Sequence, residues 1–340
     1  MSNESFIFGT ELVGRGTSTQ LDRYAGLCIF SLACIDMVLG GYNLYIVRKL
    51  DIFQNPFGRF WFSRTLGELG MNLVNGLYAG FVTYFQPISI SPLSSIVFTN
   101  LSYFFGCHAC VMHQVISVNR LLAVWTPFRY QFLFTNRVCK ILIFICWIVG
   151  VFLVLPLEAF PCNLLGYSPK LYSFIFVKCR PMERDYSIVG TNVNRICAFV
   201  ICLVTMFTDF FTFVKIVHIT VVGLNEIELI VVISLQRFGK INQQQNSKFK
   251  RDVRFFCQTA VQNVTMMITS AIIVIENNSL DPNNPILKIV AFNILCTTHI
   301  CNSAALILFN PEVRGRFIKR SLTVTPYSST ILHSEQPERK

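Results

Sequence analysis

The chain has 340 residues, of which 53% are hydrophobic and only 14% are charged, with a formal net charge of +11. A soluble domain carries about 25% charged residues, so this composition excludes an ordinary soluble protein. The positive charge does not indicate nucleic-acid binding, because no basic run is interleaved with aromatic residues as a single-strand groove requires. The amino-terminal residues are polar and show no basic-then-apolar start, so no cleavable signal peptide is expected.

Seven stretches of about 20 or more mostly apolar residues follow, each long enough to cross a bilayer as a helix. Membrane β-strands would be about ten residues long with alternating polarity, so the pattern favours an all-α membrane protein, a seven-transmembrane helix bundle. The predicted spans are Tyr24–Val47, Phe62–Phe85, Ser95–Val124, Cys139–Phe160, Ile196–Val222, Phe255–Ile275 and Ile286–Phe309. Residues 1–23 then form the N-terminal segment, 24–310 the membrane domain with a loop at 216–254, and 311–340 a short amphipathic helix and tail.

The loops between these spans carry an uneven distribution of basic residues. One set of loops, with the C-terminal tail, holds 21 of the 29 Lys and Arg residues, and this count places Arg59 and Arg64 in the first loop. By the positive-inside rule the N-terminus is expected outside and the C-terminus in the cytosol. Two glycosylation sequons, at Asn3 and Asn277, fall in segments predicted to be outside and agree with this orientation.

In the second predicted span, Glu68 is a carboxylate inside an apolar run. Such a group is costly in a bilayer and usually faces the bundle interior. Two interpretations stay open: a switch, or a protonated or water-paired residue that only joins helices. In the third span, His108 and His113 are five residues apart, which does not place two imidazoles on one helix face. Hydrogen bonds between helices are therefore expected for them, and no metal site.

Arg120 stands near the end of the third span, where a guanidinium needs headgroups, water or partner groups. Pro127 cannot donate a backbone hydrogen bond, so the helix is expected to end near it.

The run Asn-Arg-Leu-Leu-Ala-Val-x-x-Pro-Phe-Arg-Tyr at Asn119–Tyr130 resembles the third-helix exit and second intracellular loop of rhodopsin-like seven-helix receptors. Its asparagine version resembles the nematode serpentine chemoreceptors of class X. Ser63–Glu68 is similar to that family's Ser-Arg-x-x-x-Asn, and Trp147 matches its single tryptophan. The resemblance covers about Gly40 to Arg314. It implies a chemoreceptor in the plasma membrane of sensory neurons, without a cofactor, that binds a small molecule and couples to a heterotrimeric G-protein.

The resemblance also implies roles for single residues. Arg120 is expected to change partners on activation, and Glu68 with Asn43 and Asn302 is expected to form a polar site halfway through the bundle. The sixth span lacks the usual proline, and the seventh reads Asn302-Ser303-Ala304-Ala305-Leu306 where the broad family has Asn-Pro-x-x-Tyr. The switch and coupling residues implied are Asn43, Glu68, Asn119, Arg120, Pro127, Asn302, Asn310 and Arg314.

A ligand pocket is expected between the outer halves of the third, fifth, sixth and seventh spans. Ser102 stands where amine receptors have an aspartate, and Cys296 stands where opsins have the Schiff-base lysine. The candidate lining residues favour a neutral or weakly polar small molecule; they are Ser102, Tyr103, Gly106, Gln262, Asn293 and Cys296, with Glu158 near the mouth.

The longest predicted exterior loop contains Cys162 and Cys179, whereas Ser95 stands where rhodopsin-like receptors have the cysteine that anchors this loop. An oxidising exterior allows Cys162 and Cys179 to pair with each other; free thiols or a link to another chain are the alternatives. Ile219–Ser234 matches nothing in the family. It extends the fifth helix, lies on the membrane surface or comes from an alternative exon.

Three other classes were weighed against a receptor. Transporters often show repeats between their halves, and none is visible. Channels of the insect odorant-receptor kind have the opposite orientation. No nucleophile elbow, P-loop or paired-carboxylate motif indicates an enzyme. A non-signalling receptor-like protein stays open, because the proline and tyrosine of the seventh span are missing.

Overall fold

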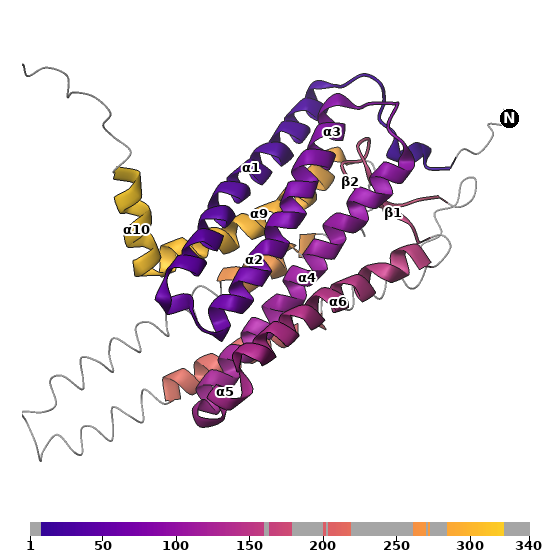
Figure 1. The fold of residues 1–340 in the computed structure, drawn as a ribbon. Helices are drawn as coiled ribbons and strands as arrows, with labels where there is room; N and C mark the ends of the chain where they lie inside the picture. The colour runs from indigo at the N-terminus through magenta and orange to yellow at the C-terminus, as the bar shows by residue number, and fades with distance from the viewer. Residues whose placement is uncertain are drawn as a thin grey trace, which may run out of the picture.

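The computed structural model describes residues 8–159, 163–178, 200–201, 203–218, 261–269, 271–272 and 284–322. Within these residues seven helical spans pack into one bundle, which confirms the all-α seven-transmembrane fold (Figure 1). The second span is continuous through three elements: α2 (Pro56–Val74), the π-helical η3 (Asn75–Gly80) and α3 (Phe81–Phe85). The others are α1 (Gln20–Lys49), α4 (Pro92–Trp125), α6 (Asn136–Ala159), helical residues within 200–218 and 261–272, and α9 (Pro285–Phe309).

Two short helices follow the third and seventh spans. The helix α4 ends two residues before Pro127, as predicted, and Pro127 begins α5 (Pro127–Leu133). The predicted amphipathic helix is α10 (Pro311–Leu322), which turns away from α9 (Figure 1).

Four of the described helices are long and apolar enough to cross a membrane: α1, α4, α6 and α9. Their large apolar side chains point outward in many places; on α6, Phe144 and Phe152 are each 65% exposed. Apolar side chains on the outside of a bundle suit contact with lipid rather than water. The chain is therefore a multi-pass membrane protein.

Several helices begin in the same way, with a capping side chain followed by proline. Asn55, Ser91 and Asn284 each accept a backbone N–H of the first turn, and the next residue is proline. A capping oxygen satisfies a free N–H, and proline at the first position lacks the N–H that would otherwise go unpaired. This signal makes the second span start at Pro56, six residues before the predicted Phe62.

The earlier start of α2 corrects the placement of two arginines. Arg59 and Arg64 both lie on α2 and not in the first loop, and the Arg64 residue is only 1% exposed. A guanidinium that is buried inside the bundle carries no information about loop charge. The bias of basic residues toward the remaining loops of that side still stands.

A hairpin that the sequence did not predict lies at one end of the bundle. Its strands β1 (Leu165–Ser168) and β2 (Ser173–Phe176) pair antiparallel, with Leu165 opposite Phe176 and Ser168 opposite Ser173. The 3₁₀ turn η1 (Thr10–Leu12) packs against β1. We call this end, with the hairpin and the N-terminal segment, the cap end, and the opposite end, with α5, the Arg120 end (Figure 1).

The wide turn η3 brings the second span close to α1. A Cβ added at Gly76 would meet the Cβ of Ala33 at 2.4 Å, so only glycine allows this approach. Single π turns inside α-helices are uncommon and occur often at functional sites.

Candidate functional site

Glu68 is the centre of a polar network inside the bundle. Its side chain is almost fully buried, and its Oε1 accepts hydrogen bonds from Nη2 and Nε of Arg64 at 2.8 and 3.0 Å. The same oxygen accepts from Asn302 Nδ2 at 2.7 Å, and His299 Nδ1 lies 3.6 Å away. Buried carboxylates need such partners, so α2 and α9 are joined at this point. The predicted proximity of Glu68 and Asn302 is confirmed.

Arg64 extends the network to the sixth span. Its Nη1 donates to Gln262 Oε1 at 3.0 Å, and Gln262 is fully buried. The sequence had suggested Gln262 as a ligand-lining residue; the structure places it against a guanidinium in the bundle interior.

A second carboxylate, which the sequence reading missed, links α1 to the same region. Asp36 is fully buried and accepts from Asn72 Nδ2 at 2.8 Å and from Ser303 Oγ at 3.5 Å. Asn43 Nδ2 donates to the Ser303 carbonyl at 3.0 Å, so Asn43 contacts the residue next to Asn302 and not Glu68 itself. An ionisable residue in an apolar helix is a functional signal. The same criterion that singled out Glu68 would have found Asp36.

A separate network joins α4 to the fifth and sixth spans. Ser117 Oγ and Asn263 Nδ2 donate to the two carboxylate oxygens of Asp209, each at 2.7 Å. His113 Nε2 lies 2.6 Å from Asn263 Oδ1. Closer to the start of α4, His108 Nε2 is hydrogen-bonded to Ser63 Oγ at 3.0 Å. The two histidines therefore bond other helices, as predicted.

Arg120 lies one turn of α4 beyond Ser117, and its environment differs from that of Arg64. Its Nε and Nη2 atoms are buried and have no hydrogen-bond partner among the described residues. The Cζ atom of the guanidinium lies 5.1 Å from the centre of the Phe57 ring. The Asp209 carboxylate attracts the guanidinium electrostatically but is not hydrogen-bonded to it. Arg120 is partly buried, and its two buried donors without acceptors are costly until an acceptor reaches them.

The other predicted coupling residues form turns around Arg120 and at the end of α9. Asn119 is buried and its Oδ1 accepts from Tyr130 OH at 3.1 Å, which holds α5 against α4. Asn310 Oδ1 accepts from the backbone N–H groups of Glu312 and Val313, so it caps α10. Arg314 is exposed on that helix.

The predicted ligand residues do not converge on one cavity in the described part of the chain. Ser102 Oγ donates to Asn75 Oδ1 at 2.7 Å, and a Cβ on Gly106 would meet Met71 Sδ at 2.9 Å, so both face the second span. The Tyr103 ring packs edge-on against Phe174 of the hairpin at 5.8 Å. Of the rest, Asn293 Nδ2 donates within α9 to Ile289 O, Cys296 is buried, and the exposed Glu158 accepts from Asn100 Nδ2 at 2.7 Å.

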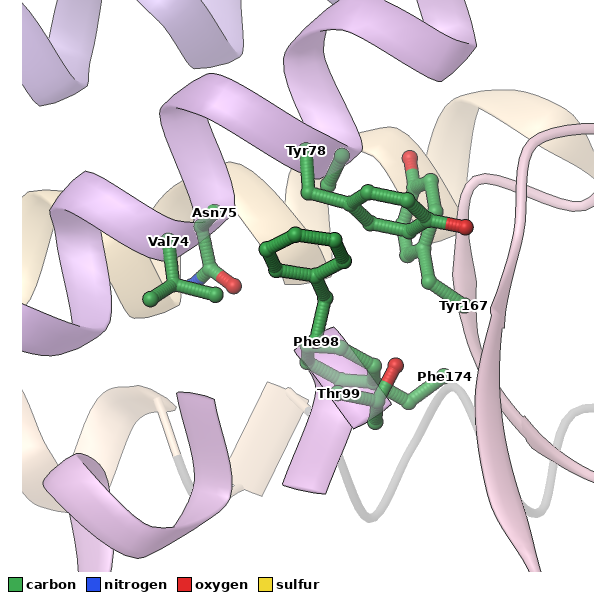
Figure 2. Close-up of a pocket in the computed structure, with 8 residues that line it drawn as sticks. Val74, Asn75, Tyr78, Phe98, Thr99, Tyr167 and Phe174 are labelled. Atoms are coloured by element: carbon green, nitrogen blue, oxygen red, sulfur yellow. The ribbon is translucent and has the colours of Figure 1, made fainter. Parts of the chain in front are cut away.

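A small pocket does lie beside the π turn, between η3, α4 and the hairpin (Figure 2). Its empty volume is about 150 Å³, part of which is open space at the rim, and it encloses no room for a water molecule. Figure 2 shows the aromatic rings around it, with the Phe98 ring stacked on Tyr78 at 4.7 Å. The lining residues are Val74, Asn75, Tyr78, Ala79, Phe98, Thr99, Tyr167 and Phe174. None of these residues carries a charge or belongs to a motif, so the sequence alone does not indicate them.

Above this pocket, the cap end is closed by hydrogen bonds to one buried carboxylate. Asp22 completes the capping box of α1 by accepting the backbone N–H of the N-cap Thr19. It also accepts from Arg15 Nη1 at 2.7 and 2.9 Å, from Gln86 Nε2 at 2.9 Å and from Tyr172 OH at 2.6 Å. Burial, and next the bond to Asp22, raise the pKa of the Tyr172 phenol, so the phenol keeps its proton. The N-terminal segment, α1, the end of α3 and the hairpin are therefore tied together.

The hairpin is fixed to α4 at Ser95. This serine stands where rhodopsin-like receptors have the cysteine that anchors the loop. Ser95 Oγ donates to the Tyr167 carbonyl and accepts from the Tyr167 N–H, both at 2.8 Å. Tyr167 is fully buried and its OH lies 2.7 Å from Thr83 Oγ1. A hydrogen-bonded serine thus joins the two segments at this position.

Some predictions fall outside the described residues. These are the pairing of Cys162 with Cys179, the sequons at Asn3 and Asn277, and the segment Ile219–Ser234.

Known proteins resemble this chain over most of its length. A family model described as serpentine type 7TM GPCR chemoreceptor Srx matches residues 30–310. Serpentine receptor class X-43 of Caenorhabditis elegans is 22% identical over 347 residues, covering 97% of this chain and 94% of that protein. The crystal structure of squid rhodopsin shares the fold, with a TM-score of 0.68 and 15% identity, over 92% of this chain and 90% of that one.

Two further relatives match only in part. Serpentine receptor class X 45 of Caenorhabditis elegans is 31% identical over 135 residues, which cover 38% of this chain and 36% of that protein. Olfactory receptor 2A2 of Homo sapiens is 25% identical over 175 residues, which cover 52% and 50%. The chain thus spans about a third to a half of these two relatives.

Proposed function

Because the chain belongs to the serpentine type 7TM GPCR chemoreceptor family Srx, we propose that it binds a small molecule near its cap end and activates a heterotrimeric G-protein at its Arg120 end. The cap end then lies outside the cell and the Arg120 end in the cytosol, at the plasma membrane of sensory cilia. The excess of basic residues in the loops of the Arg120 side supports this orientation.

The observation that carries the proposal is the unsatisfied guanidinium of Arg120. Two of its nitrogens are buried without partners in the described part of the chain, next to Asn119 and to the helix α5. An acceptor group of a cytosolic protein, such as a main-chain carbonyl or a carboxylate, would satisfy these donors. The exposed Phe128 on α5 supplies further contact surface.

Two neighbouring residues of the sixth span give the ligand a way to act on Arg120. Gln262 binds Arg64 of the Glu68 network, and Asn263 binds Asp209 of the network beside Arg120. A shift of the sixth span therefore changes both networks together. A ligand that binds one arrangement better than the other moves the population by its difference in affinity.

The test is Arg120→Ala in cells and in purified protein reconstituted with G-protein. We expect ligand-stimulated nucleotide exchange to be abolished while surface expression stays largely intact. Arg129→Ala, which changes an exposed arginine on α5, is the matched control and should keep most of the exchange. Unchanged exchange in Arg120→Ala would remove Arg120 from the mechanism.

The same assay separates a receptor from its alternatives. Ligand binding without exchange would identify a non-signalling receptor-like protein, which the missing proline and tyrosine of the seventh span make worth testing. Ligand-dependent flux across vesicles would identify a transporter or channel.

A further inference from the structure

Asp209 of the fifth span is a buried carboxylate whose two oxygens are held by two different helices. Its Oδ1 accepts a hydrogen bond from Ser117 Oγ of α4, and its Oδ2 accepts one from Asn263 Nδ2 of the sixth span, each at 2.7 Å. The residue is 5% exposed, so these donors take the place of water around the charge. Neither donor belongs to Arg120, although Arg120 lies one turn beyond Ser117 on α4.

The orientation of the Asn263 amide follows from its two neighbours. An ionised carboxylate only accepts hydrogen bonds, so the NH₂ group of the amide faces Asp209 and its oxygen faces His113. His113 Nε2, which lies 2.6 Å from Asn263 Oδ1, therefore carries the proton of this bond. His113 and Asn263 are both buried. The direction of the Asp209 carboxylate is thus fixed by a chain of donors that runs from α4 through the sixth span.

The guanidinium of Arg120 is drawn toward this carboxylate without reaching it. Side chains of a helix lean toward its start, so Arg120 leans toward the turn that carries Ser117. The charge of Asp209 attracts the guanidinium, and the charge of Arg64 repels it. Two buried nitrogens of Arg120 have no acceptor among the described residues. What keeps the two charges from pairing is therefore the set of hydrogen bonds that holds Asp209, and not a lack of attraction.

We propose that Asn263, together with Ser117, is a positioning residue that holds Asp209 away from Arg120 and so keeps Arg120 available to the G-protein. When the sixth span carries Asn263 away, the carboxylate turns to Arg120 and forms an ion pair inside the receptor. This pair occupies the donors that an acceptor of the G-protein would use, so coupling stops. The inference rests on the proposed function and adds its regulation: a molecule that stabilises the contact between Asn263 and Asp209 favours coupling, and one that separates them opposes it.

The first measurement uses the purified full-length receptor in lipid nanodiscs without G-protein. Asn263→Leu keeps the approximate size of the side chain and removes the bond to Asp209. In this background Arg120→Leu should lower the unfolding temperature, because it breaks the new ion pair, whereas in the wild type it should raise that temperature. Adding Asp209→Asn to Asn263→Leu should abolish the lowering, since the charge that Arg120 pairs with is then gone. Ser117→Ala, which releases the other oxygen, is the second background and should give the same change of sign.

The second measurement is nucleotide exchange without agonist, followed as uptake of a non-hydrolysable GTP analogue by a purified heterotrimeric G-protein. Asn263→Leu should lower the rate about tenfold, which is the effect expected of one hydrogen bond to a charged group. Asp209→Asn in the same protein should restore most of the rate. Val264→Ala, which changes the next residue of the sixth span at a position that is 55% exposed, is the control and should alter neither measurement.

The inference is overturned if Arg120→Leu shifts the unfolding temperature in the same direction in the wild type and in both released backgrounds. It is also overturned if Asn263→Leu exchanges nucleotide as fast as Val264→Ala does. A receptor that shows the change of sign but no exchange in any variant, the wild type included, would overturn the proposed function and leave Asn263 as the residue that keeps Asp209 from Arg120.

Discussion

The two ends of the bundle treat an arginine in opposite ways. At the cap end, Arg15 donates to both oxygens of Asp22 and, through Nη2, to the Lys170 carbonyl at 2.8 Å. At the other end, Arg120 has two buried nitrogens without a partner in the described residues. Among the described residues, the Arg15 guanidinium of the cap end thus has acceptors, whereas two nitrogens of Arg120 have none.

The largest expected effect comes from Arg64, which provides the buried and fully paired reference for Arg120. Arg64→Leu leaves the Glu68 carboxylate without its cation, and we expect a loss of about 3–5 kcal/mol in unfolding free energy. Thermal unfolding of the purified protein in detergent measures it. The double variant Arg64→Leu/Glu68→Leu should lose less than the single one, because no charge remains buried. A double variant that loses the sum of both single losses would contradict this.

Removing the carboxylate at the cap end is expected to have the next largest effect. Asp22→Ala leaves Arg15, Gln86 and Tyr172 without their shared acceptor, and we expect a loss of about 3 kcal/mol. Limited proteolysis within residues 9–19 should become faster, since these contacts hold the segment. Arg23→Ala, which removes only an exposed bond to Ser18, serves as control and should change stability by less than about 0.5 kcal/mol. Equal losses in the two variants would mean that the cap is not held through Asp22.

Ser95→Ala tests a smaller contact of the same end. It removes both hydrogen bonds to the Tyr167 main chain, and the expected loss is about 2 kcal/mol. Hydrogen exchange at the Tyr167 amide should accelerate. Ser94→Ala, one residue earlier, should leave that exchange rate unchanged; if it accelerates exchange equally, the effect is general to the start of α4.

The smallest effect is expected at Arg120, and it has the opposite sign. Arg120→Leu replaces a partly buried cation, two of whose donors lack acceptors among the described residues, so the unfolding free energy should rise by about 1 kcal/mol while nucleotide exchange is lost. Arg129→Leu, at an exposed site, should change neither by much. A destabilised Arg120→Leu protein would show that Arg120 is already satisfied within the receptor, and the contrast between the two ends would then fail.

The spans could be predicted because apolar runs of this length have few other uses in a protein. The boundaries were less predictable: the start of the second span depends on the Asn55-Pro56 cap, and missing that signal placed the buried Arg64 in a loop. The hairpin could not be found, since each of its strands has four residues and no alternating pattern.

In the candidate site, residue type predicted Glu68 as the centre of the polar network but not most of the hydrogen bonds around it. Glu68 and Asn302 were expected to lie close together, and Asn302 Nδ2 donates to Glu68 Oε1 at 2.7 Å. The bonds from Arg64 to Gln262 and from Asn263 to Asp209 join positions far apart in the chain, and only the packing of the helices decides them. The pocket depends on a π turn at Asn75–Gly80, which no local residue pattern specifies.

The serine tie between α4 and the hairpin has a practical consequence for making this protein. The two hydrogen bonds between Ser95 Oγ and the Tyr167 main chain, one donated and one accepted by the serine, form as soon as the segments meet, so this junction forms without an oxidant or an isomerase. A reducing agent does not undo it. Synthesis in a reducing system, such as a cell-free extract supplied with nanodiscs, should therefore form this junction as completely as synthesis under oxidising conditions does.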